Sequence, residues 1–149
     1  MSNRAHIISV IPVYNGERFI TATLDSLAAQ TLKPDRVIVL DDASTDGTAQ
    51  LVESYQPLRC ELIRSEENKG LFKNFNRALE FAAECDFLHY ICADDVLLPE
   101  FMQRMKMVQD HMNSKNFAAD GGRGLDGLAK ELLDRCRDLV KRRGERLPK

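Results

Sequence analysis

The sequence lacks the features of a membrane-spanning or disulfide-bonded chain. No apolar run approaches the roughly 20 residues that a membrane-spanning helix needs, and the chain does not open with a basic flank followed by a long apolar core. Successive cysteines stand 25, 7 and 44 positions apart and form no Cys-X-X-Cys pair. We therefore expect a cytoplasmic chain with reduced thiols at Cys60, Cys85, Cys92 and Cys136.

Basic residues are too few in the main body to indicate a nucleic-acid-binding protein. Residues 113–149 hold ten lysines and arginines against six acidic residues, which leaves eleven against seventeen in residues 1–112. The small net charge of −2 therefore conceals an acidic body and a basic tail. A cation is a more suitable partner for the body than a nucleic acid.

Several catalytic signatures are also missing. The sequence contains no P-loop and no Gly-X-Ser-X-Gly nucleophile motif. The three histidines, His6, His89 and His111, lack the spacing of metal ligands. His89 falls within an apolar, strand-like run, so we expect its imidazole to be packed or hydrogen-bonded rather than catalytic.

Strand and helix patterns alternate along the first 112 residues. The length of 149 residues and the hydrophobic content of 44% allow one substantial core. Because alternation of this kind needs crossover connections, it predicts an α/β fold with a mostly parallel sheet flanked by helices. Short apolar runs predict strands at 7–13, 36–40, 60–64 and 86–92. Helical spacing is seen in Phe19, Ile20, Leu24 and Leu27; in Leu51, Val52 and Tyr55; in Phe72, Phe75, Leu79 and Ala82; and in Phe101, Met105, Val108 and Met112.

The tail differs from this body in composition. We expect a domain of residues 1–112 followed by an atypical basic tail, 113–149. After a loop-like stretch, helical spacing predicts an additional C-terminal amphipathic helix over 125–143, which would pack on the core, a partner chain or a second copy. Its apolar residues are Leu125, Leu128, Leu132, Leu133, Cys136, Leu139 and Val140.

Acidic residues follow the second predicted strand. Asp41 and Asp42 end the run VIVLDD, and Ser44, Thr45 and Asp46 come next. One of these three is expected to cap the following helix, but capping does not require Asp41 or Asp42. A carboxylate at a strand end can accept hydrogen bonds from the imide N–H of a base or from ribose hydroxyls, and ligands of open α/β sheets bind at this edge.

A second acidic pair, Asp94 and Asp95, follows the fourth strand. Adjacent carboxylates repel one another unless a positive group lies near them. A Mg²⁺ or Mn²⁺ ion held by one or two carboxylates and completed by substrate phosphates would meet that need. The alternative is that Asp94 leads into a turn before Pro99 and that Asp95 is solvated.

The third strand leads into the segment SEENKGLFKNFNRAL, residues 65–79. Gly70 would let the backbone approach a ligand, and a helix start with Lys73 and Asn76 nearby suits an anionic group. The segment is also compatible with an ordinary loop whose charged side chains are solvated.

Four stretches together resemble one known family. In this order and spacing, SVIPVYNGERFI, QTLKPDRVIVLDDASTDGT, ENKGLFKNFNRAL and YICADDVLLPEFM are similar to the nucleotide-sugar-binding half of the inverting family 2 glycosyltransferases, which have the GT-A fold. The resemblance covers residues 7 to about 112. Asp42 and Asp94, the centres of its two acidic motifs, are 52 residues apart.

The resemblance implies a role for each matching residue. Asp42 would hydrogen-bond the nucleobase, usually uracil, of a UDP-sugar donor. Asp94 would bind the metal as part of the family's D-x-D element, and Asp95 matches the acid that often follows. The remaining positions are Pro12, Val13 and Tyr14, which would line the nucleoside pocket with Glu17 close by, and Gly70, Lys73 and Asn76 near the ribose and diphosphate.

This sequence departs from the family pattern in two ways. Cys92 occupies the first D-x-D position, which leaves a metal with fewer carboxylates. The family's acceptor-binding half supplies an acidic general base, and neither Asp120, Asp126 nor Asp134 stands in a matching context, so the base is not identified. The chain is thus compatible with a shortened enzyme that borrows its acceptor site, with a nucleotide-sugar-binding or interaction module without turnover, or with a truncated product. A saccharide or lipid-linked acceptor, and peripheral contact with the inner membrane face, are further expectations.

Overall fold

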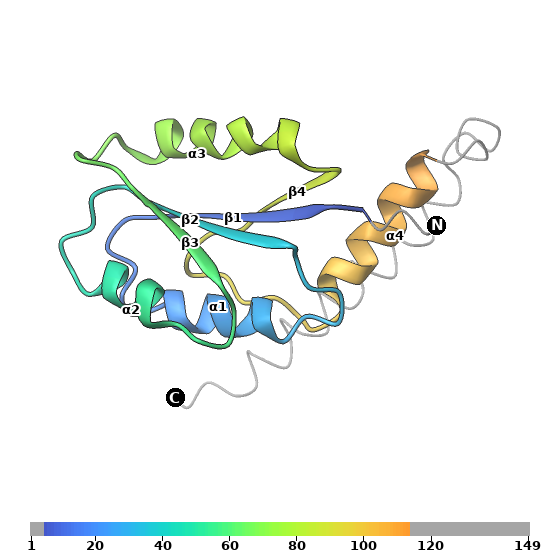
Figure 1. Cartoon of the computed structure of the whole chain (residues 1–149), viewed down its shortest axis with the longest axis horizontal. Helices are drawn as coiled ribbons and strands as arrows, with labels where there is room; N and C mark the ends of the chain where they lie inside the picture. The colour runs from blue at the N-terminus through green and yellow to red at the C-terminus, as the bar shows by residue number, and fades with distance from the viewer. Residues whose placement is uncertain (1–4, 114–149) are drawn as a thin grey trace, which may run out of the picture. The chain divides into compact units, whose positions relative to one another are not determined.

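The computed structural model describes residues 5–113, and Figure 1 shows their alternating strands and helices. The predicted helix over 125–143 lies outside these residues. The chain divides into two units, residues 1–103 and 104–149, and the following description concerns the first. The strands are β1 (Ile7–Val13), β2 (Arg36–Asp41), β3 (Cys60–Arg64) and β4 (Phe87–Tyr90). The helices are α1 (Ile20–Ala28), α2 (Thr48–Ser54), α3 (Leu71–Leu79), the short 3-10 helix η1 (Glu80–Glu84) and α4 (Phe101–Asn113).

All described strand pairs are parallel, as predicted, in the order β3-β2-β1-β4. Strand β1 is central and all seven of its residues are buried, which is why its sequence is continuously apolar rather than alternating. The register pairs Val13 with Asp41 and Asp41 with Arg64. The carboxyl ends of β1, β2 and β3 therefore lie level at one edge of the sheet, and the residues after them are brought together.

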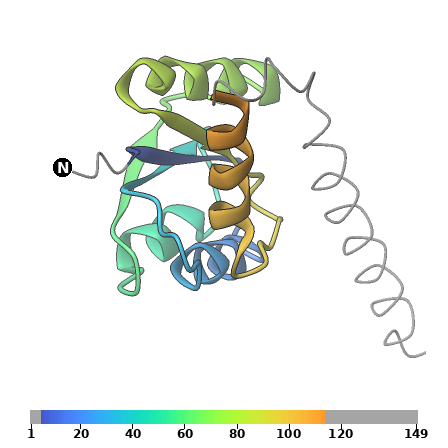
Figure 2. The same cartoon turned by 90° about the vertical axis from the view of Figure 1, so that its right-hand side faces the viewer.

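Helices cover both faces of the sheet. Figures 1 and 2 show α1 and α2 on one face and α3 on the other. The core is divided accordingly: Ile11, Val37 and Val39 of the sheet pack with Leu24 of α1, whereas Val10, Ile38 and Leu40 pack in a second cluster with Ala78 of α3. A sheet covered on both faces holds the loops at its edge on a rigid base.

Helix α3 buries a different face from the one that its apolar pattern favours. Phe72 is 84% exposed and Leu79 is 55% exposed, while Asn74 and Ala78 are buried. The reason is polar: the Asn74 side-chain amide donates to the Leu40 carbonyl at 2.9 Å, which fixes the rotation of the helix. Ala82 belongs to η1 and not to α3. The spacing predicted the helix correctly but not its orientation.

Candidate functional site

The loop after β1 forms one part of the site. Tyr14 is half-exposed, and Asn15 adopts a left-handed backbone with φ 51°. At Gly16 the chain passes so close to β1 that a Cβ atom would lie 2.5 Å from Val13 Cγ2. Because real Cβ atoms do not approach a neighbour this closely, any side chain at position 16 would force the Val13 side chain to move.

Asp41 and Asp42 are adjacent in sequence but have different environments. Asp41 is fully buried, and its Oδ1 accepts from the Ser44 amide at 3.0 Å. Its Oδ2 lies 3.2 Å from Arg64 Nε in an ion pair without hydrogen-bond geometry. Arg64 also donates to the Ser44 carbonyl. Asp41 thus stabilises the loop between β2 and α2 from within the protein.

Asp42 instead joins this loop to the segment before α3. Its carboxylate accepts from the Lys69 amide at 3.0 Å to each oxygen and from the Gly70 amide at 2.8 Å. Gly70 has φ 85°, a left-handed conformation that glycine adopts without strain. A carboxylate offers about four lone-pair sites, so Asp42 retains capacity for a further donor.

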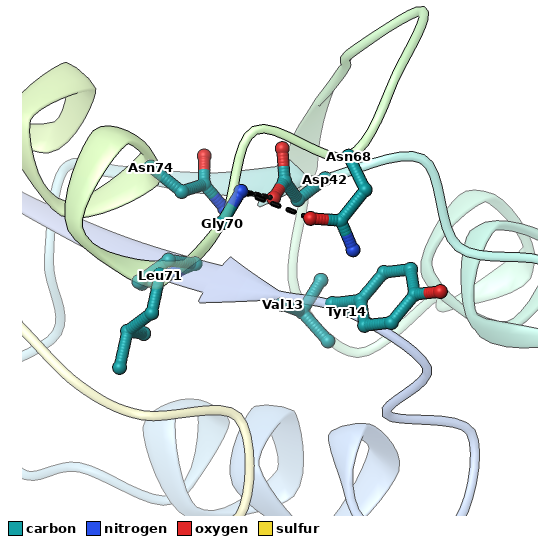
Figure 3. A pocket seen from close by; sticks show the side chains of 8 residues that line it. Val13, Tyr14, Asp42, Asn68, Gly70, Leu71 and Asn74 are labelled. Carbon is teal, nitrogen blue, oxygen red and sulfur yellow. Dashed lines mark hydrogen bonds between the residues drawn. The ribbon is translucent and has the colours of Figure 1, made fainter.

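The carboxylate of Asp42 borders a cavity of about 240 Å³. Figure 3 shows Asp42, Asn68 and Gly70 on one side of it and Val13 and Tyr14 on the other. The lining therefore combines apolar side chains with the few polar groups that fix a ligand's orientation. Its residues are Pro12, Val13, Tyr14, Asp42, Asn68, Gly70, Leu71 and Asn74.

A second cavity, of about 380 Å³, adjoins the first and extends to Asp94. The two share Pro12, Val13, Tyr14 and Leu71 as lining residues. The second adds Asn15, Gly16, Phe19, Tyr90, Cys92, Ala93 and Asp94. One hollow surface thus runs past the end of β1 and has an aspartate at each end.

The Asp94 end suits a hard cation only in part. Asp94 and Asp95 are exposed carboxylates, and the Asp95 amide donates to the Cys92 carbonyl at 3.1 Å in a tight turn. Burial, together with the charges of Asp95 and Asp94, raises the pKa of the Cys92 thiol. Its sulfur is a soft donor, whereas Mg²⁺ and Mn²⁺ prefer oxygen ligands, so Cys92 is a poor ligand for either ion. Within residues 5–110 no three His, Cys, Asp or Glu side chains converge on one point. A metal here would need oxygen ligands from a bound diphosphate, as Mg²⁺ sites often do.

Four of the predicted site residues line neither cavity, among them Asp95, which directly follows Asp94. Lys73 and Asn76 are exposed on α3 and line neither one. Glu17 also lines neither, and its carboxylate accepts from the Gly47 amide at 2.8 Å. Asn68 and Asn74 line the Asp42 cavity instead. No sequence signal singled them out, because their positions follow from the conformation around Gly70 and the rotation of α3.

Two further expectations concern His89 and the helix cap. His89 is buried, with Nδ1 3.1 Å from Ser9 Oγ and its ring beside Phe101, which confirms a packed residue. Burial lowers its pKa to about 4. Asp46 accepts from the Thr48 amide at 3.0 Å, so a nearby side chain satisfies the first backbone donor of α2. The N-cap residue itself is Gly47, which has no side chain, so the predicted cap position was wrong.

Residues 9–119 match the model of glycosyl transferase family 2, so the chain belongs to that family. Among curated relatives, the poly(ribitol-phosphate) beta-N-acetylglucosaminyltransferase TarS of Staphylococcus aureus is 38% identical over 98 residues, which are 63% of this chain and 17% of TarS. The putative glycosyltransferase EpsH of Bacillus subtilis is 33% identical over 98 residues, 64% of this chain and 28% of EpsH. The chain thus spans well under half the length of these relatives.

Solved structures agree with this assignment. TarS residues 1–349 in complex with UDP superimpose with a TM-score of 0.64 and 35% identity, over 73% of this chain and 33% of that one. The mannosyltransferase PcManGT of Pyrobaculum calidifontis, in complex with GDP-Man and Mn²⁺, gives 0.62 and 25% identity over 76% and 34% of the two chains. The parallel sheet flanked by helices is therefore the GT-A fold, as predicted.

In the described part of the chain, no helix combines sufficient length with sufficient hydrophobicity to cross a bilayer. Cys60, Cys85 and Cys92 are free thiols.

Proposed function

We propose that this domain binds a nucleotide-diphospho-sugar, with UDP as the nucleotide, and presents it for inverting transfer of the sugar to an acceptor hydroxyl. The observation that carries the proposal is the hollow surface that joins Asp42 to Asp94 along the end of β1. In such a ligand the diphosphate is attached directly to the nucleoside, and the two adjoining cavities could hold one part each. The complexes of TarS with UDP and of PcManGT with GDP-Man and Mn²⁺ support this choice of ligand.

The Asp42 cavity would hold the nucleoside. The remaining lone-pair site of the Asp42 carboxylate suits the imide N–H of uracil, and Tyr14 and Leu71 provide apolar surface for the flat base. Pro12 and Val13 form the end of a fully buried strand and give the base a rigid support. Asn68 adds an amide side chain for further hydrogen bonds to the nucleoside.

The Asp94 end would hold the diphosphate together with a divalent cation. Asp94 would provide a carboxylate oxygen, Asp95 is the neighbouring candidate, and the diphosphate would supply the other ligands. When bound, such a cation stabilises the charge that develops on the leaving nucleoside diphosphate. Cys92 offers a soft sulfur in place of a carboxylate, so this chain would rely on Asp94 more heavily than a site with two carboxylates would.

Thermal unfolding tests the proposal. The full chain is heated with UDP, GDP or dTDP, each with Mn²⁺, Mg²⁺ or EDTA, and uridine serves as the control without a diphosphate. A ligand at about 100 times its dissociation constant stabilises the native state by about 2.7 kcal/mol. We expect a UDP-specific rise in melting temperature that EDTA reduces. A cooperative transition that no nucleotide shifts would contradict the proposal.

Binding without turnover is a second candidate, because no residue of this chain is identified as the general base. Incubation with a UDP-sugar and a panel of saccharide and lipid-linked acceptors, with release of UDP as the readout, separates the two. Metal-dependent UDP release that needs an acceptor supports transfer. Binding without such release supports a nucleotide-sugar-binding module.

A further inference from the structure

Two loops at the edge of the sheet exchange hydrogen bonds in both directions. From the loop after β1, Asn15 Oδ1 accepts from the Thr45 amide at 2.8 Å, and Glu17 Oε2 accepts from the Gly47 amide at 2.8 Å. These side chains satisfy backbone donors that precede α2 and that no helical carbonyl reaches.

The loop after β2 returns the same kind of contact. Ser44 Oγ accepts from the Asn15 amide at 2.9 Å, Thr48 Oγ1 from the Gly16 amide at 2.9 Å, and Asp46 Oδ2 from the Glu17 amide at 3.1 Å. We call this set of five backbone-to-side-chain bonds between residues 15–17 and 44–48 the loop latch. Side chains of each loop thus accept hydrogen bonds from backbone amides of the other loop.

Left-handed backbone occurs within the loop latch and directly before it. Asn15 (φ 51°) directly follows Tyr14, and Ala43 (φ 62°) directly follows Asp42. A left-handed conformation is unfavourable for alanine and persists only where the surroundings enforce it. Burial acts to raise the pKa of the Asp46 carboxyl, but hydrogen bonds from the side chain and backbone of Thr48 and from the Glu17 amide outweigh it, and the pKa falls below its usual range. Asp46 therefore stays ionised and a strong acceptor.

We propose that the loop latch fixes Tyr14 relative to Asp42, and that Glu17 is a positioning residue that acts through Gly47 rather than by contact with the nucleotide. Tyr14 and Asp42 line the same cavity from two loops. The sheet ladder joins these loops only up to the bond from the Asp42 amide to the Val13 carbonyl at 2.8 Å, so beyond that bond the loop latch holds them together. Glu17 lines neither cavity, and its bond to Gly47 closes the far end of the loop latch. The effect on nucleotide affinity rests on the proposed function, whereas the effect on the free protein does not.

Calorimetric titration with UDP and Mn²⁺ provides the first test, with Glu17→Ala, Glu17→Gln and, as control, Glu53→Ala on the exposed face of α2. Glutamine keeps a carbonyl oxygen that can accept from Gly47, whereas alanine does not. Loss of one hydrogen bond predicts an affinity about five- to tenfold weaker for Glu17→Ala, with Glu17→Gln and Glu53→Ala within about twofold of the native chain. Equal weakening in Glu17→Ala and Glu17→Gln would overturn the proposal, because it would indicate direct contact by the charge. Native affinity in Glu17→Ala would also overturn it.

Amide hydrogen exchange of the ligand-free proteins provides the second test. We expect Glu17→Ala to accelerate exchange not only at Gly47 but also at Asn15 and Gly16, which donate across the loop latch, with near-native rates restored in Glu17→Gln. Acceleration confined to Gly47 would overturn the proposal. If the native chain binds no nucleotide, the proposed function fails, while exchange still decides whether the loops are coupled.

Discussion

Asp42 and Gly70 are separated by 28 residues in the chain, yet the Gly70 amide donates to Asp42 Oδ2 at 2.8 Å. This bond connects the end of β2 to the start of α3 along one wall of the Asp42 cavity. The residue with the strongest claim to bind the base therefore also shapes the wall opposite Val13 and Tyr14, and its substitution has two consequences that must be measured separately.

Replacing Asp42 should affect both stability and binding. In Asp42→Ala the Lys69 amide loses its acceptor and the Gly70 amide keeps only Asn68 Oδ1, at 2.9 Å. An unsatisfied donor costs about 1–3 kcal/mol where water cannot reach it. We expect the free energy of unfolding in urea to fall by about 2 kcal/mol and UDP affinity to be lost in calorimetry. Asp42→Asn keeps one acceptor oxygen and should retain most of the stability while still binding UDP weakly. Unchanged UDP affinity in Asp42→Asn would remove the carboxylate from the base site.

Substitutions at Asp94 and at Cys92 should change the Mn²⁺ dependence of UDP binding in opposite directions. Asp94→Asn removes a carboxylate ligand, and we expect the stabilisation by UDP to become independent of Mn²⁺. Cys92→Asp replaces a protonated thiol by a hard oxygen ligand, and Mn²⁺ should then enhance UDP binding more strongly than in the native chain. Calorimetry with Mn²⁺ and with EDTA measures both effects. Retained Mn²⁺ dependence in Asp94→Asn would contradict the assignment.

His89 should make stability depend on pH. Burial lowers its pKa from 6.5 to about 4, so between these values the unfolded chain binds a proton that the folded chain does not. The stability it contributes is complete above pH 6.5 and is lost as pH falls toward 4, in total about 3 kcal/mol. Urea unfolding at several pH values should show this decline, and His89→Gln should flatten it. An equally steep decline in His89→Gln would assign the dependence to other groups.

Replacement of Ala43 by glycine should cost less stability than replacement of a helical alanine by glycine does. Its left-handed backbone costs about 1 kcal/mol, which glycine avoids. We expect Ala43→Gly to be neutral or to stabilise the fold by up to about 1 kcal/mol, and Ala43→Val to destabilise it by more than 1 kcal/mol. Ala22→Gly, on the exposed face of α1, is the matched control and should cost about 1 kcal/mol. Equal losses at the two positions would show that no strain is relieved at Ala43.

The orientation of α3 predicts unequal effects at two of its positions. Phe72 is 84% exposed, so Phe72→Ser should change the free energy of unfolding by less than about 0.5 kcal/mol. Ala78 is 1% exposed and packs beneath the sheet face formed by Ile38 and Leu40, so Ala78→Leu should cost about 1–3 kcal/mol through overpacking. The opposite ranking in urea unfolding would mean that the helix presents its apolar stripe to the core.

The sequence predicted the sheet well because the signal is local. A strand such as β1, buried on both faces, must be apolar at every position, and its end is marked by the polar residues that follow. Strand β4 is shorter than predicted, since the chain turns at Cys92 and Asp95 soon after Tyr90. Local patterns therefore gave the elements and their order, but their ends less well.

The division of roles within the site was harder to predict because it depends on distant partners. By residue type and local pattern, Asp41 and Asp42 look equivalent. In the structure Asp41 forms an ion pair with Arg64 inside the loop, whereas Asp42 accepts from the amides of Lys69 and Gly70 beside the cavity. Asn74 could not be preferred over Asn76 without the rotation of α3, which the Leu40 carbonyl fixes. Contacts between residues that are 20 to 35 positions apart produce no periodic pattern in the sequence.

Gly16 helps to set the volume of the hollow surface, because it lies against Val13. A methyl group there would meet Val13 Cγ2 at 2.5 Å, and Val13 lines both cavities. The most direct relief is for Val13 to turn toward the space that it borders, so a side chain added at position 16 would be felt as lost volume where the ligand lies. The absence of a Cβ atom at position 16 therefore helps to determine how large a ligand the site can hold.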